Sequence, residues 1–212
     1  MRNLAHGWRL QSDEGSDELV REFIRPALRA VPRAVAGRLG VCLIRLEPSL
    51  PNPDSASQWR ETREGYEIVV ATGETDPHDV ALELLLCLGQ ALWEKLDHSE
   101  RSGYLLQLDA EFHSGVTGEI NDVACSEKEA LLSSRISAIS RRRLERYARA
   151  SFASTAAEYI HAMWHDVTVR EGGEHLPAHV VKKRLQMLSR WFPPNRGRRL
   201  FGRTTLTLDS DS

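Results

Sequence analysis

Apolar side chains surround almost the whole circumference of one predicted helix, at residues 79–97. Its start is marked by Asp76 as N-cap, Pro77 at the first helical position and Asp79 near the positive end of the helix dipole. At about 100° per residue, only a narrow polar stripe remains. This stripe consists of Asp79, Glu83, Gln90, Glu94 and Asp97, with Leu86 set among them. A helix that is apolar on nearly all sides is expected in the core.

The N-terminal half predicts one helix followed by two strands. Residues 16–36 place apolar side chains at helical spacing, and Pro26 and Pro32 are expected to kink or shorten that helix. Residues 41–46 and 66–71 are short apolar runs of the kind that form strands. The proline-rich stretch between them predicts a loop. The expected order is therefore a helix, two strands and the core helix.

Helices are predicted for most of the C-terminal half. They cover residues 104–112, residues 126–150, which open on a capping box at Ser126, and residues 151–167. The last helix again carries one narrow polar stripe, formed by Ser151, Ser154, Glu158, His161 and His165. With the strands, this pattern predicts an α+β fold, with one domain over residues 1–203 and a flexible polar tail over residues 204–212.

Length, charge and cysteine content narrow the class of protein. With 212 residues and 41% hydrophobic content, the chain can bury a core of its own. A net charge of -2 gives no general attraction to nucleic acid or to a membrane surface, and no apolar run approaches the about 18 residues of a membrane span. Cys42, Cys87 and Cys125 are odd in number and lack metal-ligand spacing. We therefore expect reduced thiols in a soluble cytoplasmic protein.

The core helix contains a motif that resembles the active-site helix of a peptidase family. Residues 85–93, LLCLGQALW, resemble the L-H-E-L-G-H-A-L helix of zincin metallopeptidases. In that family two histidines one turn apart bind zinc, and the glutamate beside the first histidine activates the metal-bound water. On this match Leu86 stands at the first ligand position, Cys87 at the general base and Gln90 at the second ligand position.

A second match lies in the helix predicted over residues 151–167. Its run FASTAAEY, at residues 152–159, is similar to the F-A-E-x-F-A-E-x run that supplies the third zinc ligand in gluzincins, including lethal-factor-like toxin peptidases. Glu158 takes the position of the glutamate ligand. Together the two matches imply a zincin-like core over residues 66–167, with a small mixed sheet packed on a buried central helix and a mostly helical C-terminal half.

The side chains at the matched positions argue against peptidase chemistry. Leu86 has no donor atom, the neutral amide of Gln90 is a poor ligand, and Glu158 alone cannot hold zinc, which needs three or four ligands. Cys87 is the next residue after Leu86, so its side chain points about 100° around the helix from the direction in which the first zinc ligand should point. We therefore expect no zinc cofactor and no peptidase activity, in a pseudo-enzyme that binds a peptide or protein or serves as a structural component. The enzyme alternative is a metal-dependent hydrolase with non-standard ligands.

Two other kinds of chemistry are conceivable on the same helices. Glu158, His161 and His165 share one helix face at ligand spacing and could form a rebuilt metal site, although helix histidines are more often hydrogen-bonded. Cys87 could act as a nucleophile, but a thiolate needs an adjacent base or positive charge. A cysteine on a leucine-lined helix is usually inert.

A basic stretch near the C-terminal end offers a third alternative. Residues 178–203 contain no Asp or Glu, and apolar positions give their helix one hydrophobic side. The basic residues considered are Lys182, Lys183, Arg184, Arg190, Arg196, Arg198 and Arg199. Such a helix can dock on an anionic surface or an acidic partner. We favour the simpler interpretation, in which it covers the domain and its arginines are solvated.

Two geometric expectations follow from the resemblance. Residues 66–71 should form the edge strand beside the core helix, along which an extended peptide could add as a further strand. Gln90 and Glu158 should meet within hydrogen-bonding reach, directly or through one water, because a buried carboxylate needs a partner. Leu86 should then fill the space of the first ligand.

Overall fold

One mixed five-stranded sheet forms the β part of the protein, and its strand order is β1-β2-β3-β5-β4. A computed structural model describes residues 1–53, 55–73, 75–133, 139–165 and 175–200. The strands are Arg2–Asn3 (β1), Arg9–Gln11 (β2), Val41–Glu47 (β3), Ser57–Glu61 (β4) and Gly65–Ala71 (β5). β2, β3 and β5 run parallel to one another, and the edge strands β1 and β4 are antiparallel to their neighbours. The predicted α+β class is confirmed.

The helix predicted over residues 16–36 is divided by its prolines. It consists of α1 (Asp17–Leu19), a π-helical turn (Val20–Ile24), α2 (Arg25–Ala30) and α3 (Arg33–Leu39). Pro26 is the second residue after the π turn, whose wider hydrogen-bonding pattern accommodates a residue without an N–H. Pro32 is extended and separates α2 from α3. The expected kink is therefore present.

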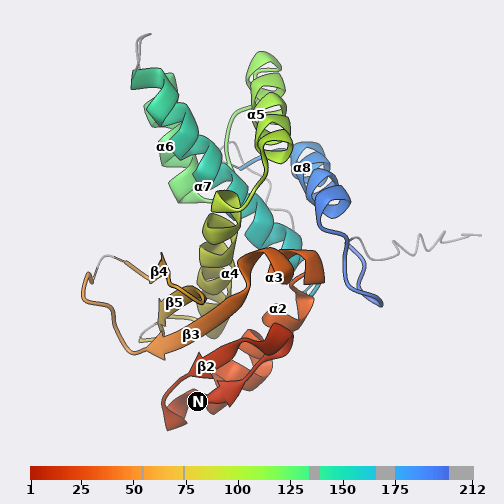
Figure 1. The fold of residues 1–212 in the computed structure, drawn as a ribbon. Helices are drawn as coiled ribbons and strands as arrows, with labels where there is room; N and C mark the ends of the chain where they lie inside the picture. Colours follow the sequence, from red (N-terminus) through yellow and green to blue (C-terminus); the bar gives the residue numbers. More distant parts are fainter. Residues whose placement is uncertain (54, 74, 134–138, 166–174, 201–212) are drawn as a thin grey trace, which may run out of the picture.

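The central helix α4, Pro77–Glu94, begins as the sequence predicts. The side chain of Asp76 accepts a hydrogen bond from the backbone N–H of His78 at 2.8 Å, which is the N-cap interaction. α4 occupies the middle of the molecule, between the sheet and the helices of the C-terminal half (Figure 1). Among the described residues, no helix has the length and apolar character needed to cross a bilayer.

The C-terminal half is helical, with two corrections to the predicted boundaries. Its helices are α5 (His98–His113), α6 (Asp122–Leu132), α7 (Ile139–His161) and α8 (Ala178–Trp191). The predicted start at Ser126 is wrong, because the side chain of Asn121 already caps the helix by accepting from Ala124 N–H at 2.9 Å. Nothing between Asn121 and Ser126 breaks a helix, so the earlier cap sets the start. Residues 151–161 continue α7, whereas 166–167 and the tail at 204–212 lie outside the described residues.

α4 and α7 pack with their backbones in close approach. A methyl group added at Gly89 of α4 would lie 2.6 Å from the backbone oxygen of Ala153 in α7. Only a residue without a side chain therefore allows the two helices to come this close. On its other side α4 covers the buried residues of the sheet, among them Ile44 of β3 and Ile68 of β5.

A buried group of charged side chains joins the C-terminal helices. Arg184 of α8 is 0% exposed. Its guanidinium donates to both carboxylate oxygens of Glu111 in α5 and to both of Glu119, which precedes α6. A further N–H donates to the hydroxyl of Ser151 in α7 at 2.8 Å. All five N–H donors of the guanidinium are thus satisfied inside the protein.

Lys128 of α6 adds a second buried cation to this group. Its ammonium donates to the carbonyl oxygens of Val116 and Gly118 at 3.0 and 2.9 Å, and lies 3.9 Å from Glu119. The hydroxyl of Tyr147 in α7 donates to the same carboxylate. We call this group the Arg184 cluster; it consists of Arg184, Glu111, Glu119, Lys128, Tyr147 and Ser151. The cluster therefore connects α5, α6, α7 and α8.

Hydrogen bonding keeps the carboxylate of Glu119 ionised. Burial alone would raise the pKa of Glu119, but the hydrogen bonds and charge of Arg184 outweigh burial and lower that pKa. Burial also lowers the pKa of Lys128. The charges of Arg184 and Lys128 formally cancel those of the two glutamates, so the group can remain inside the helical half.

We expect Arg184→Met to destabilise the protein by about 3–5 kcal/mol, because it leaves two buried carboxylates without their cation. Urea unfolding followed by circular dichroism measures the loss. Lys183→Met is the matched control on the same helix, since Lys183 is exposed, and it should change the free energy of unfolding by less than about 0.5 kcal/mol. Equal effects of the two substitutions would contradict the role given to Arg184.

Gly89→Ala should destabilise the protein by about 1–3 kcal/mol, because the added methyl group collides with the backbone of α7. Gly37→Ala in α3 is the control, since a methyl group there meets nothing within 4 Å. That substitution should stabilise the protein by up to about 1 kcal/mol through helix propensity. Thermal or urea unfolding measures both changes, and a stabilised Gly89→Ala variant would contradict the close packing of α4 on α7.

Candidate functional site

The strand at the edge of the sheet beside α4 is β4. β5, which contains the predicted edge residues 66–71, pairs with β3 on one side and with β4 on the other. The expectation that a peptide adds along residues 66–71 is therefore wrong. β4 was missed because its residues, SQWRE, have no run of apolar side chains. Within the described residues, the outer edge of β4 has no strand partner.

β4 is fastened to the polar stripe of α4 by alternate side chains. The hydroxyl of Ser57 donates to Glu83 at 2.7 Å, and the indole N–H of Trp59 donates to the amide oxygen of Gln90 at 2.7 Å. Beyond the end of α4, Lys95 donates to Glu61 at 2.8 Å. Successive side chains of a strand alternate between its two faces, so the odd-numbered positions of β4 face α4.

The positions matched to the zincin motif therefore lie beneath β4. Leu86 is half-buried and packs against the core. Cys87 is 2% exposed, and burial raises the pKa of its thiol to about 12. A hydrogen bond with Ser57 opposes this rise in pKa and the charge of Glu83 adds to it, and the raised pKa makes Cys87 a poor nucleophile.

Gln90 and Glu158 have different hydrogen-bonding surroundings from those expected. Gln90 accepts from Trp59, and the hydrogen bonds of the described residues include none between Gln90 and Glu158. The predicted contact is therefore not a direct hydrogen bond, and contact through one water stays a prediction. Trp59 supplies a partner that the sequence did not indicate, and Glu158 lies instead beside a histidine, with its carboxylate 3.7 Å from Nδ1 of His161.

The histidines of the second stripe are joined by one from α4. Nε2 of His78, in the first turn of α4, lies 3.0 Å from Nε2 of His161 at the end of α7. The ring of His165 lies 5.8 Å from each of these two rings, measured between ring centroids. The structure thus brings His161 and His165 together, as their spacing predicts, and adds His78. We call the three residues the histidine cluster.

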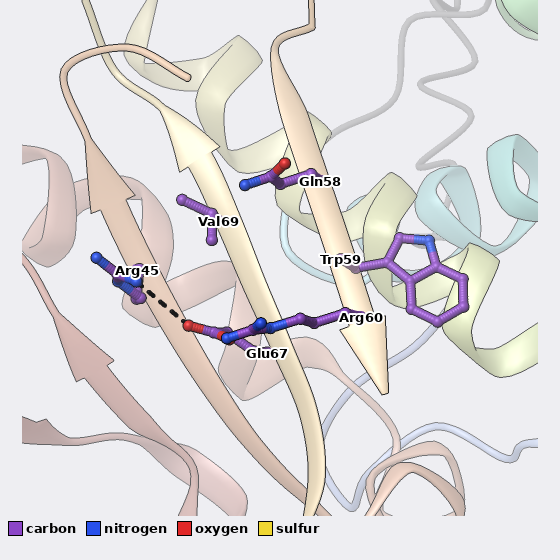
Figure 2. A pocket seen from close by; sticks show the side chains of 6 residues that line it. All are labelled: Arg45, Gln58, Trp59, Arg60, Glu67 and Val69. Carbon is purple, nitrogen blue, oxygen red and sulfur yellow. Dashed lines mark hydrogen bonds and ion pairs between the residues drawn. The ribbon is translucent and has the colours of Figure 1, made fainter. Parts of the chain in front are cut away.

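The face of the sheet away from α4 carries a shallow pocket of about 320 Å³ (Figure 2). Trp59 forms part of its rim and points away from the other side chains shown. Glu67 on β5 lies between Arg45 and Arg60, which both donate to it. Burial opposes the ionisation of Glu67, but these hydrogen bonds outweigh burial and lower its pKa. Arg45 also donates to Glu47 at 2.6 Å, and its Nε has no hydrogen-bond partner. Each charged side chain that lines the pocket is thus part of an ion pair.

The basic residues near the C-terminal end do not all lie on the surface. Arg184 is buried in the Arg184 cluster, so its place in the predicted basic patch is wrong. Arg198 donates to the backbone oxygen of Met163 at 2.9 Å. The exposed members of the patch are Lys182, Lys183, Arg190, Arg196 and Arg199.

The sequence-based predictions missed or misplaced three residues of these sites, Arg184, Trp59 and His78. Arg184 could have been found, because it lies with Val181, Leu185 and Leu188 on the apolar side of an otherwise basic helix. Trp59 and His78 gave no comparable signal, since each owes its position to a contact with a residue distant in sequence.

The described side chains define no complete enzymatic site. Among them, no three His, Cys, Asp or Glu side chains have donor atoms already placed around one ion position. Comparison of the chain with profiles of known protein families, with curated proteins and with solved structures gave no match. A function for this protein must therefore be inferred from the geometry of the chain itself.

At pH 8 only one of the three thiols should react readily with a thiol reagent such as Ellman's reagent. Burial raises the pKa of Cys42 and of Cys87 to about 12, so about one in 10⁴ of each is thiolate at that pH. Cys125 is partly exposed and should be the reactive one. Cys125→Ser should remove the fast reaction, and unfolding should release the other two thiols. Fast labelling of Cys87 in the folded protein would reinstate it as a nucleophile.

Proposed function

We propose that the protein is a zincin-like pseudo-enzyme that binds an extended peptide segment along β4 without cleaving it. The observation that carries this proposal is the position of β4: an antiparallel edge strand, unpaired on its outer side within the described residues, fastened over the polar stripe of α4. In zincin-like peptidases the substrate lies against an edge strand beside the active-site helix. The same order of strand and helix supports the resemblance, which rests on residues 85–93 and 152–159.

The hydrogen-bonding pattern of β4 leaves backbone groups free for a peptide. Ala71 N–H donates to Ala56 at 2.9 Å and Thr62 N–H donates to Gly65 at 2.7 Å, which marks both ends of the ladder with β5. In an antiparallel ladder alternate residues make these bonds. The register places the backbone N–H and C=O groups of Ser57, Trp59 and Glu61 on the outer edge. The carbonyl oxygen of Ser57 already accepts from the Ser55 hydroxyl at 2.8 Å, so the groups offered to a peptide are the Ser57 N–H and both groups of Trp59 and Glu61. An extended peptide can pair with this edge as a sixth strand.

The side chains under β4 argue for binding without hydrolysis. Leu86 has no donor atom, and the amide oxygen of Gln90 already accepts from Trp59. Cys87 is protonated near neutral pH, so it cannot activate a water molecule as the family's glutamate does. Catalytic zinc at the matched positions would need ligands that this chain does not supply. We therefore assign the function to binding.

Glu61→Pro should weaken peptide binding about tenfold, because it removes an outward N–H while leaving the ladder with β5 intact. The probe is a pool of synthetic unstructured dodecapeptides, with affinity measured by NMR titration of the ¹⁵N-labelled protein. Glu61→Ala is the matched control, since it loses the same ion pair with Lys95 but keeps the N–H.

Hydrogen exchange in the same samples locates the binding. In the free protein the amides of Gln58 and Arg60 should be protected and that of Trp59 should exchange fast. Bound peptide should protect Trp59 as well. Binding that leaves the Trp59 amide unprotected, or that is equally tight in both Glu61 variants, would contradict addition along β4.

A further inference from the structure

The histidine cluster lies where α4 begins and α7 ends. These two helix termini are far apart in the sequence. His78 and His161 are 83 positions apart in sequence. The centroids of their rings are 4.9 Å apart, and that of His165 is 5.8 Å from both. In a tetrahedral zinc site with Zn–N distances of about 2.0–2.1 Å, imidazole centroids are about 5 Å apart. The three rings therefore have nearly the spacing of a three-histidine metal site.

The ring nitrogens of two of these histidines are oriented as in metal sites. The two Nε2 atoms face one another at 3.0 Å, whereas tetrahedral ligands on zinc are separated by about 3.3 Å. On the opposite side of each ring lies a carboxylate. Nδ1 of His161 is 3.7 Å from Glu158, and Nδ1 of His78 is 3.8 Å from Asp79. Metal-binding histidines commonly present their second nitrogen to a carboxylate, which orients the ring.

The hydrogen bonding of the histidine cluster is incomplete. His161 is 8% exposed, and its Nδ1 has no hydrogen-bond partner. A hydrogen bond between the two Nε2 atoms requires one ring to donate and the other to accept, so the two rings must take different proton positions. A metal ion between them would accept a lone pair from both Nε2 atoms. Both Nδ1 atoms would then carry a proton, and a small rotation of the side chains would bring Glu158 and Asp79 from 3.7 and 3.8 Å to hydrogen-bond distance.

We propose that His78, His161 and His165 bind a divalent transition-metal ion such as Zn²⁺, through Nε2 of the first two. No nitrogen of His165 is already placed around this ion position, so its exposed side chain must turn to bring one to the ion. A water molecule completes the tetrahedron. Imidazole suits zinc, nickel and copper. Glu158 acts as a positioning residue, through Nδ1 of His161. This site is separate from Leu86 and Gln90 and does not depend on peptide binding.

The test is a titration of the full chain, stripped of metal with a chelator, with Co²⁺ and then with Zn²⁺. Tetrahedral nitrogen coordination gives Co²⁺ a visible absorption band, and added Zn²⁺ should abolish it by displacement. Each of His78→Ala and His165→Ala should weaken Zn²⁺ binding at least tenfold. His179→Ala, at an exposed histidine of α8, is the matched control and should leave the affinity unchanged.

Further variants separate this site from the zincin-like positions. Glu158→Gln should weaken Zn²⁺ binding about 10–100-fold while retaining the absorption band with excess Co²⁺, as expected of a positioning residue. Gln90→Ala should have no effect on the metal. The melting temperatures of the metal-free variants show that they are folded. Absence of a tetrahedral band in the wild type, or affinity unchanged by His78→Ala or by His165→Ala, overturns the proposal.

Discussion

The guanidinium of Arg184 determines how the C-terminal helices pack, because it has no access to water and must find every partner inside the protein. It uses its five donors on Glu111, Glu119 and Ser151, which belong to three different segments. Moving ions out of water costs several kcal/mol for each ion, and good geometry is needed to recover it. We infer that the cluster specifies the arrangement of α5, α7 and α8 more than it adds to stability, since a shifted helix would leave a buried charge unpaired.

This fixed helical half supports α4, and α4 in turn supports the strand that we propose as the binding edge. Gly89 lets α7 approach one side of α4, while Gln90 at the following position accepts from Trp59 of β4. Neighbouring residues of one helix thus set the packing and the position of the proposed site. The polar stripe that would carry catalysis in a zincin serves here to hold β4 through hydrogen bonds.

The sequence predicted those parts whose structure depends on local periodicity. The apolar circumference and cap at Asp76 were sufficient to place α4, and Pro32 to divide the first helix. Other features depend on residues far away in the chain. β4 is a strand because β5 pairs with it, and a polar segment such as SQWRE shows no pattern of its own. The contact between His78 and His161 likewise arises from the packing of α4 on α7, which no spacing along the chain encodes.

Mass spectrometry of a peptide pool incubated with the purified protein and excess Zn²⁺ tests the central claim, binding without cleavage, most directly. Peptides that co-elute with the protein on size exclusion should be recovered with unchanged masses after prolonged incubation. Cleavage products that form with the wild type and disappear in both Gln90→Ala and Glu158→Gln would contradict the claim, because the matched residues would then act as a catalytic site.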